Sequence, residues 1–252
     1  MTLWTLVKLS ILEFIRDRTV WIGFFVAVLL FGLSVVLGSL SFNEQQRILA
    51  HFGWAAIQLS TLMTSLILSA NWLHKETDRQ TCLLVLARPV SRAQFLSGKY
   101  LSILGLIAVI QILLAACLWT LLGFTYSLSA FATVCYGTFL EVAMVFSLCF
   151  FAATFLRPAL AFFLGLGVFL IGNWIQEVEF FGQRFKIVFY TRLAQALHWF
   201  CPNLYQFNWR SVYFLENGIS HEHLLWSTVH ALGWILLTYS LAIFIFRRKD
   251  LV

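Results

Sequence analysis

The sequence predicts an all-α integral membrane protein with six transmembrane helices and an N-terminal amphipathic helix at the membrane interface. Hydrophobic residues make up 61% of the 252 residues and charged residues only 11%, whereas soluble domains contain about 25% charged residues. The apolar residues gather in runs of about 20, the length that a helix needs to cross roughly 30 Å of hydrocarbon. Because no Gly/Ser linker or charge block divides these runs, we expect one membrane domain over residues 1–252.

The first expected element is an interface helix over residues 1–18. Its apolar side chains recur on one helical face, and its polar side chains lie mostly elsewhere on the wheel. It lacks the continuous apolar core of a cleavable signal, so we expect it to lie in the cytoplasmic interface. Either it only anchors the first span, or Glu13, Arg16 and Asp17 also form part of a docking surface.

Six apolar runs follow as expected spans, and they cover residues 19–40, 52–73, 100–124, 130–156, 159–175 and 224–246. Only Arg157 and Pro158 separate the fourth run from the fifth. Because proline cannot continue the preceding helix, we expect a tight helical hairpin there. The fifth run is short, so it forms either a full crossing, which we expect, or a deep and incomplete span.

The distribution of Lys and Arg predicts that both termini are cytoplasmic, because cytoplasmic loops carry an excess of these residues. Twelve of the seventeen Lys and Arg residues fall on the side of the two termini and of the 74–99 loop. The net charge of +6 mostly reflects this asymmetry, so it gives no reason to expect a nucleic acid partner.

Residues 176–223 are the expected extracytoplasmic loop between the fifth and sixth spans. The loop is nearly neutral and rich in aromatic residues, which a disordered loop would not be. The segment "FKIVFYTRLAQALHWF" (185–200) has the pattern of an amphipathic helix resting at the outer interface. Pro202 and Asn203 then break that helix and predict an irregular turn.

Glu141 is the only acidic or basic residue inside an expected span. An ionisable residue at that depth is a functional candidate, since burying its charge in the membrane is costly. One interpretation is structural: the carboxyl is hydrogen-bonded to a neighbouring helix, with Gln58 and Gln111 as candidate partners. The other is that Glu141 and Gln111 line a pathway or a subunit interface.

No catalytic residue, metal site or bound cofactor is expected in this chain. The five cysteines form no C-x-x-C pair, and His221 and His223 make only a weak H-x-H pattern. The glycines at 165–172 lie inside a span and lack the pattern of a phosphate-binding loop. We find no nucleophile elbow, so a membrane enzyme is poorly supported.

The stretch 74–99 gathers charge between two apolar runs. We expect the second span to continue as a helix through the polar "HKETDRQT" and the apolar "CLLVLA" (74–87), and Arg88 and Pro89 to force extended backbone. Ser91 followed by Gln94 makes a capping-box pattern, so a new helix is expected from Arg92 into the third span. These features together predict a compact cytoplasmic knob.

This order of residues resembles the cytoplasmic loop of ABC-2 type transporter permeases. In that family a glutamate, a threonine, a short apolar run, P-x-S-R and G-K recur after the second span, as Glu76, Thr81, "RPVSR" (88–92) and "GKY" (98–100) do here. Gln80 stands where the family often has glycine. The segments "EFIRDR" (13–18) and "FRRKDL" (246–251) are similar to the family's two ends, so the resemblance covers essentially the whole chain.

The resemblance implies the membrane subunit of an ATP-binding cassette exporter, placed in the bacterial inner membrane. A separate ATPase subunit would hold ATP and Mg, and a second copy of the chain or a related permease would complete the complex. The implied ATPase-coupling residues are Glu76, Thr77, Asp78, Arg79, Gln80, Thr81, Arg88, Pro89, Ser91 and Arg92. The alternative is an ATP-independent channel or secondary carrier, but we find no internal repeat or paired broken helices. Neither interpretation identifies the cargo.

Overall fold

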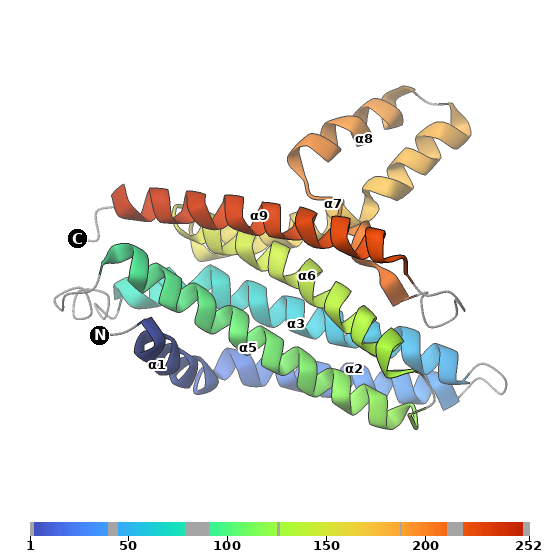
Figure 1. Cartoon of the computed structure of the whole chain (residues 1–252), viewed down its shortest axis with the longest axis horizontal. Helices are drawn as coiled ribbons and strands as arrows, with labels where there is room; N and C mark the ends of the chain where they lie inside the picture. Colours follow the sequence, from blue (N-terminus) through green and yellow to red (C-terminus); the bar gives the residue numbers. More distant parts are fainter. Residues whose placement is uncertain are drawn as a thin grey trace.

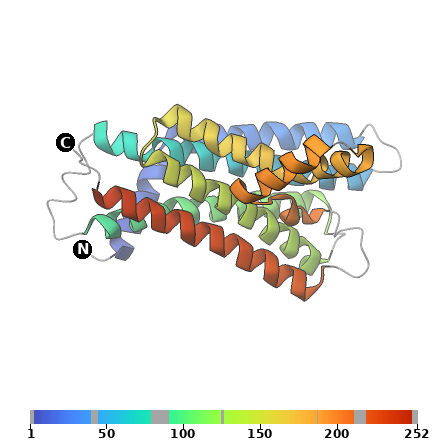
Figure 2. The same ribbon diagram turned by 90° about the horizontal axis from the view of Figure 1, so that it is seen from above.

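The computed structural model describes residues 3–39, 45–78, 91–124, 127–186, 188–210 and 219–248. Every regular element within these ranges is a helix, and none is a strand. Figure 1 shows long helices lying side by side in an elongated bundle, and the view from above in Figure 2 shows the same arrangement. The elements in chain order are α1 (Leu3–Ile15), α2 (Arg18–Ser39), α3 (Gln45–Asp78), α5 (Arg92–Leu121), α6 (Leu128–Ala153), α7 (Pro158–Phe185), α8 (Val188–Phe200), the short 3-10 helix η1 (Tyr205–Phe207) and α9 (His221–Arg248). We call the end of the bundle that holds α1 and the C-terminal end of α9 the near end, and the opposite end the far end.

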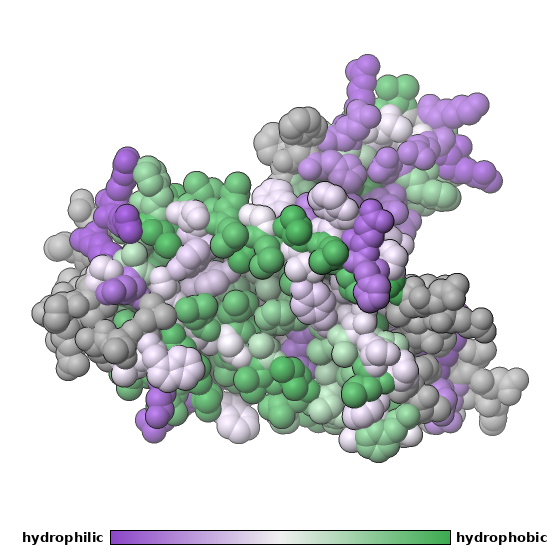
Figure 3. All heavy atoms as spheres, in the orientation of Figure 1, coloured by the Kyte–Doolittle hydropathy of each residue, from purple (hydrophilic) through white to green (hydrophobic). Residues whose placement is uncertain are grey.

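Helices α3 and α6 form the centre of the bundle. Helix α3 packs against α2, α5, α6 and α7, while α6 also packs against α9. Trp72 of α3 stacks on Phe150 of α6 with ring centroids 4.6 Å apart, and Tyr100 of α5 meets Phe150 edge-on. Helices α2 and α9 expose many large apolar side chains, and Figure 3 shows apolar residues over the flank of the bundle. This distribution suits a lipid-facing surface.

Five described helices are long and apolar enough to cross a membrane: α3, α5, α6, α7 and α9. The first expected span corresponds to α2, where the apolar described stretch Gly23–Ser39 is shorter. A sixth crossing at α2 therefore stays a prediction.

Two local predictions of helix boundaries are confirmed. The Ser91 side chain accepts a hydrogen bond from the Gln94 amide at 3.2 Å, and the Gln94 side chain accepts one from the Ser91 amide at 3.1 Å. This capping box satisfies two backbone donors that the first turn of α5 would otherwise leave unpaired. At the α6–α7 hairpin, Arg157 is the N-cap residue and Pro158 is the first residue of α7, where a missing N–H costs nothing.

Helix α7 is longer than the expected fifth span, which ends at Ile175. Helix α7 continues to Phe185, where Lys186 ends it in the left-handed conformation with φ 54°. No proline lies between Ile175 and Phe185, so the backbone hydrogen bonds of the helix continue there. A drop in hydropathy does not by itself end a helix. The expected amphipathic helix at 185–200 is found as α8, which begins three residues later because of this break. Figure 1 shows α8 and the end of α7 projecting away from the bundle.

Helix α1 lies against α5 at the near end. Leu6, Val7 and Phe14 of α1 are buried, whereas other apolar side chains, such as Trp4 and Leu9, are exposed. A Cβ atom at Gly98 of α5 would lie 3.2 Å from the Leu6 Cβ, so the two helices approach closely there. The helix therefore has one apolar face on the protein and another directed outward. The second face fits the expected interface position, which stays a prediction.

Candidate functional site

The expected helical start of the 74–99 loop is present, because α3 extends to Asp78. Glu76 lies one turn beyond the Trp72 ring and is almost completely buried. Its carboxylate forms an ion pair with Lys99 of α5, whose side chain is 7% exposed against 6% for Glu76. A charge pair so removed from water is stable only when its partners are well positioned, so Glu76 and Lys99 fix α3 against α5.

Lys99 also pairs with the interface helix. Its Nζ lies 2.7 Å from Oε2 of Glu13 in α1, and 5.3 Å from the centroid of the Phe14 ring. Glu13 is 45% exposed, so this second pair is the weaker of the two. One ammonium group thus joins α1, α3 and α5. We call Glu13, Glu76 and Lys99 the charge triad.

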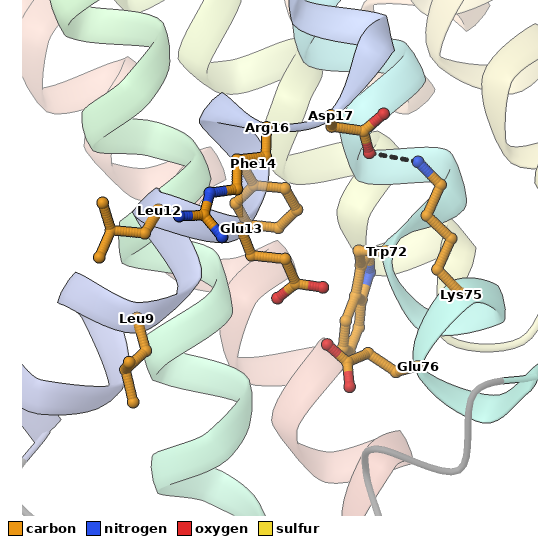
Figure 4. Close-up of a pocket in the computed structure, with 9 residues that line it drawn as sticks. All are labelled: Leu9, Leu12, Glu13, Phe14, Arg16, Asp17, Trp72, Lys75 and Glu76. Atoms are coloured by element: carbon orange, nitrogen blue, oxygen red, sulfur yellow. Dashed lines mark hydrogen bonds and ion pairs between the residues drawn. The ribbon is translucent and has the colours of Figure 1, made fainter.

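A second ion pair joins the end of α1 to α3. Lys75 of α3 pairs with Asp17, which lies in the turn between α1 and α2. Between these pairs lies a pocket of about 660 Å³, lined by Leu9, Leu12, Glu13, Phe14, Arg16, Asp17, Trp72, Lys75 and Glu76. Figure 4 shows the carboxylates of Glu13 and Glu76 turned toward the space between α1 and α3. The predicted interface residues Glu13, Arg16 and Asp17 therefore gather beside Glu76.

The first turn of α5 is also tied to the end of α9. Arg92 donates a hydrogen bond from Nη1 to the carbonyl oxygen of Arg247 at 3.2 Å. Ser91 caps the same turn and is exposed. The near end thus joins α1, α3, α5 and α9 through polar contacts on both sides of the 74–99 loop.

The remaining predicted coupling residues contribute no described side chains. Thr77 and Asp78 belong to the last turn of α3, but their side chains lie outside the described part of the chain. Five others lie wholly outside it: Arg79, Gln80, Thr81, Arg88 and Pro89. The predicted break at Arg88 and Pro89 is untested for the same reason.

Lys99 and Lys75 are the residues that sequence reasoning left out of the site. Counting by the positive-inside rule explains both as cytoplasmic anchors, and that explanation does not require a partner. The available signal was position: Lys99 follows Arg92 by two helical turns on α5, at the start of an apolar span. A lysine that is followed by about 20 apolar residues and lies next to packed helices needs a carboxylate nearby.

A second polar cluster lies deep in the bundle around Glu141. Its Oε2 accepts a hydrogen bond from Gln58 Nε2 at 2.5 Å, and its Oε1 accepts one from Asn173 Nδ2 at 2.8 Å. These contacts join α3, α6 and α7, and Glu141 is only 1% exposed. Gln58 was an expected partner, whereas Asn173 was missed because the fifth run reads as a featureless apolar span. The arrangement favours the structural interpretation of Glu141.

Gln111 is not a partner of Glu141. Its amide group donates to Thr138 Oγ1 at 2.7 Å and to the carbonyl oxygen of Cys135 at 2.9 Å, so it joins α5 to α6 instead. The expected pairing is wrong because the sequence does not reveal the rotation of α5 about its axis. Gln111 and Cys135 do line a shallow pocket of about 330 Å³ together with Ala108, Ile112, Ala132, Tyr136 and Phe139.

The part of the chain that the structure describes brings no three His, Cys, Asp or Glu residues together as metal ligands. His221 and His223 lie exposed in the first turn of α9.

Comparison with known families gives one clear match. The family model described as "ABC-2 family transporter protein" matches residues 4–251, nearly the whole chain. No curated protein matches the chain. The family match and the five apolar helices together identify a multi-pass integral membrane protein.

Proposed function

Because the chain belongs to the ABC-2 transporter family, we propose that it is the membrane-spanning permease subunit of an ATP-binding cassette exporter. A separate ATPase subunit, which holds ATP and Mg, drives it from the cytoplasmic side. A second permease copy completes the membrane part, as a homodimer or a related heterodimer. The membrane is the bacterial inner membrane, and both termini lie in the cytoplasm, as the Lys and Arg distribution favours.

The charge triad is the observation that carries this proposal. Helices α3 and α5 flank the loop where the ATPase docks, and Lys99 holds both of them together with α1. Because the three helices are joined near the loop, a push on the loop moves them as one unit. Packed helices transmit such a displacement into the membrane, since close-packed interiors are not easily compressed.

The coupling residues divide by burial into two roles. Glu76 is buried, so it acts as a positioning residue that holds α3 against α5. Ser91 is exposed and Arg92 partly exposed at the start of α5, where a partner subunit can reach them. Together with residues 77–90 they form the proposed docking surface for the ATPase.

The ATPase partnership is tested by purifying the tagged chain from its native membrane. We expect an ATPase subunit to come with it, and the purified complex to hydrolyse ATP and move cargo in proteoliposomes. The charge reversal Arg92→Glu should reduce both co-purification and ATP-driven transport. The matched control is Arg192→Glu, on the exposed surface of α8, which should change neither. Absence of any co-purifying ATPase, together with no ATP-dependent transport, would refute the proposal.

The alternative function is that of an ATP-independent channel or carrier, and the buried Gln58–Glu141–Asn173 cluster is the feature that could serve it. Such a carrier would show flux without ATP that depends on Glu141. Under our proposal the flux requires ATP, and Glu141 holds helices together.

A further inference from the structure

Residues Pro202–Arg210 insert several side chains into the bundle, while Tyr205 and Asn208 stay exposed. Leu204 and Phe207 are completely buried, and Trp209 is 4% exposed. The segment is compact: η1 occupies its middle, and Trp209 Nε1 donates to the Gln206 carbonyl oxygen at 2.7 Å. So deep a position is unusual for the irregular connection between two helices, since such segments usually run over the surface.

Two glycines make room for this segment. A Cβ atom at Gly172 of α7 would lie 2.7 Å from Leu204 Cγ and 2.8 Å from the Pro202 carbonyl oxygen. A Cβ atom at Gly137 of α6 would lie 2.6 Å from Trp209 Cε3 and 2.9 Å from the Phe207 carbonyl oxygen. No Cβ tolerates such distances, so each glycine forms a notch that receives the segment.

Each notch lies next to a residue of the Glu141 cluster. Gly172, whose carbonyl oxygen accepts from the Leu204 amide at 3.2 Å, directly precedes Asn173, a hydrogen-bond donor to Glu141. Gly137 lies one helical turn before Glu141 on α6. The segment therefore contacts α6 and α7, two of the three helices that build the cluster.

Arg210 at the end of the segment supplies a complementary charge. It is partly buried, and burial lowers the pKa of its guanidinium, while the nearby Glu141 acts in the opposite direction. The described residues form no ion pair between Arg210 and Glu141, so the electrostatic attraction between them acts at longer range and favours the inward position of the segment.

The segment also carries a feature that works against its buried position. Two of its polar atoms, Asn203 Oδ1 and Gln206 Nε2, are buried without a hydrogen-bond partner in the described part of the chain. Both atoms would gain partners in water if the segment moved out. Close packing and attraction to Glu141 therefore oppose a desolvation cost, as expected for an element with two positions.

We propose that residues Pro202–Arg210 form a plug that closes the bundle above the Gln58–Glu141–Asn173 cluster and withdraws when cargo passes. The role in cargo movement rests on the proposed transport function. The proposal that the segment closes the bundle does not rest on that function, because it concerns the permease alone.

Closure is tested on the purified chain in lipid nanodiscs, with its native cysteines replaced and Leu204→Cys as a reporter for a hydrophilic maleimide. Leu204 is inaccessible in the plugged state, so labelling should be slow. Gly137→Ala should speed it by about 5- to 30-fold, because overpacking the notch shifts the plug outward. Gly167→Ala, at a glycine of α7 with nothing within 4 Å, is the matched control and should leave the rate unchanged.

A second variant guards against misfolding of Gly137→Ala, which a thermal scan would reveal. Arg210→Gln removes the attraction to Glu141 and should also speed labelling of the reporter. Labelling of both variants at the rate of the parent chain would overturn the plug.

Withdrawal is tested by locking the segment with a disulfide between Gly172→Cys and Leu204→Cys. The Leu204→Cys change removes the Cγ and Cδ1 atoms that lie nearest to a Cβ at position 172, so the two cysteines can form a bridge there. Oxidation should abolish ATP-driven transport, and a reductant should restore it, while each single cysteine variant stays insensitive to oxidant. Undiminished transport by a fully cross-linked complex would overturn withdrawal. Failure of the reduced complex to transport would count against the proposed function, and the labelling rates would still decide whether the plug exists.

Discussion

Replacement of Lys99 by methionine is the most direct test of the charge triad. Methionine keeps the length and apolar stem of the side chain but removes the ammonium group that pairs with Glu76 and Glu13. Loss of one partner from a buried pair leaves a desolvated charge and costs about 3–5 kcal/mol. The pair with Glu13 adds only about 0.2–1 kcal/mol, because Glu13 is 45% exposed.

The assay is a thermal scan of the purified chain, followed by the fluorescence of its tryptophans. At about 2–4 °C per kcal/mol, Lys99→Met should lower the apparent Tm by about 6–20 °C. All variants need the same scan rate, because a membrane protein that unfolds irreversibly reports a rate as well as an equilibrium. The control is Lys75→Met: its partner Asp17 is partly exposed and Lys75 is 37% exposed, so we expect a loss of only about 0.2–1 kcal/mol.

The double variant Lys99→Met with Glu76→Met decides whether the charge pair is the cause. Replacement of both partners by apolar residues removes the uncompensated charge, so most of the lost stability should return. Transport should be low both in Lys99→Met and in the double variant, since neither joins α3 to α5 through the charge pair. If Lys99→Met is as mild as Lys75→Met, or if Glu76→Met gives no rescue, the burial argument for the triad is wrong.

Three further predictions follow from single contacts. Ser91→Ala removes half of the capping box of α5 and should lower the free energy of unfolding by about 0.5–2 kcal/mol, measured in a thermal scan. A loss of stability no larger than that of the exposed Thr120→Ala would contradict the cap. Gly165→Ala would bring a Cβ atom within 2.5 Å of Leu66 Cδ2 and should destabilise the protein by about 1–3 kcal/mol. The neighbouring Gly167→Ala should be neutral or slightly stabilising. Equal effects of the two variants on stability would argue against close packing of α3 and α7. Glu141→Leu removes the carboxylate that accepts hydrogen bonds from the amide groups of Gln58 and Asn173, and it should cost about 1–3 kcal/mol of stability. Glu141→Gln keeps one acceptor and should cost less. An unchanged Tm for Glu141→Leu, combined with lost transport, would instead favour a pathway role for Glu141.

The helix boundaries show which features local sequence can predict. Ser91 and Gln94, or Arg157 and Pro158, act within one turn of backbone, so their effect does not depend on the rest of the fold. The end of α7 shows the limit of hydropathy. The length of an apolar run indicates which residues can lie in the hydrocarbon of the membrane. The helix itself continues until Lys186 adopts the left-handed backbone conformation.

The candidate sites show the same division. The charges of Glu76, Lys99 and Glu141 stand out in the sequence because charge is rare in this chain. Their partners do not, since they depend on the rotation of each helix and on which helices are neighbours. Glu141 pairs with Gln58, 83 positions away along the chain, and not with Gln111.

The amino-acid sequence by itself determined a helical membrane protein, the continuation of the second span as a helix to Glu76 and the local start of α5. Apolar run length, charge spacing and capping chemistry decide these features within one or two turns. Only the tertiary structure decided that Lys99 joins three helices and that residues Pro202–Arg210 pack against α6 and α7 beside the Glu141 cluster. Such contacts arise where helix faces meet, and the facing residues are set by the packing of the whole bundle.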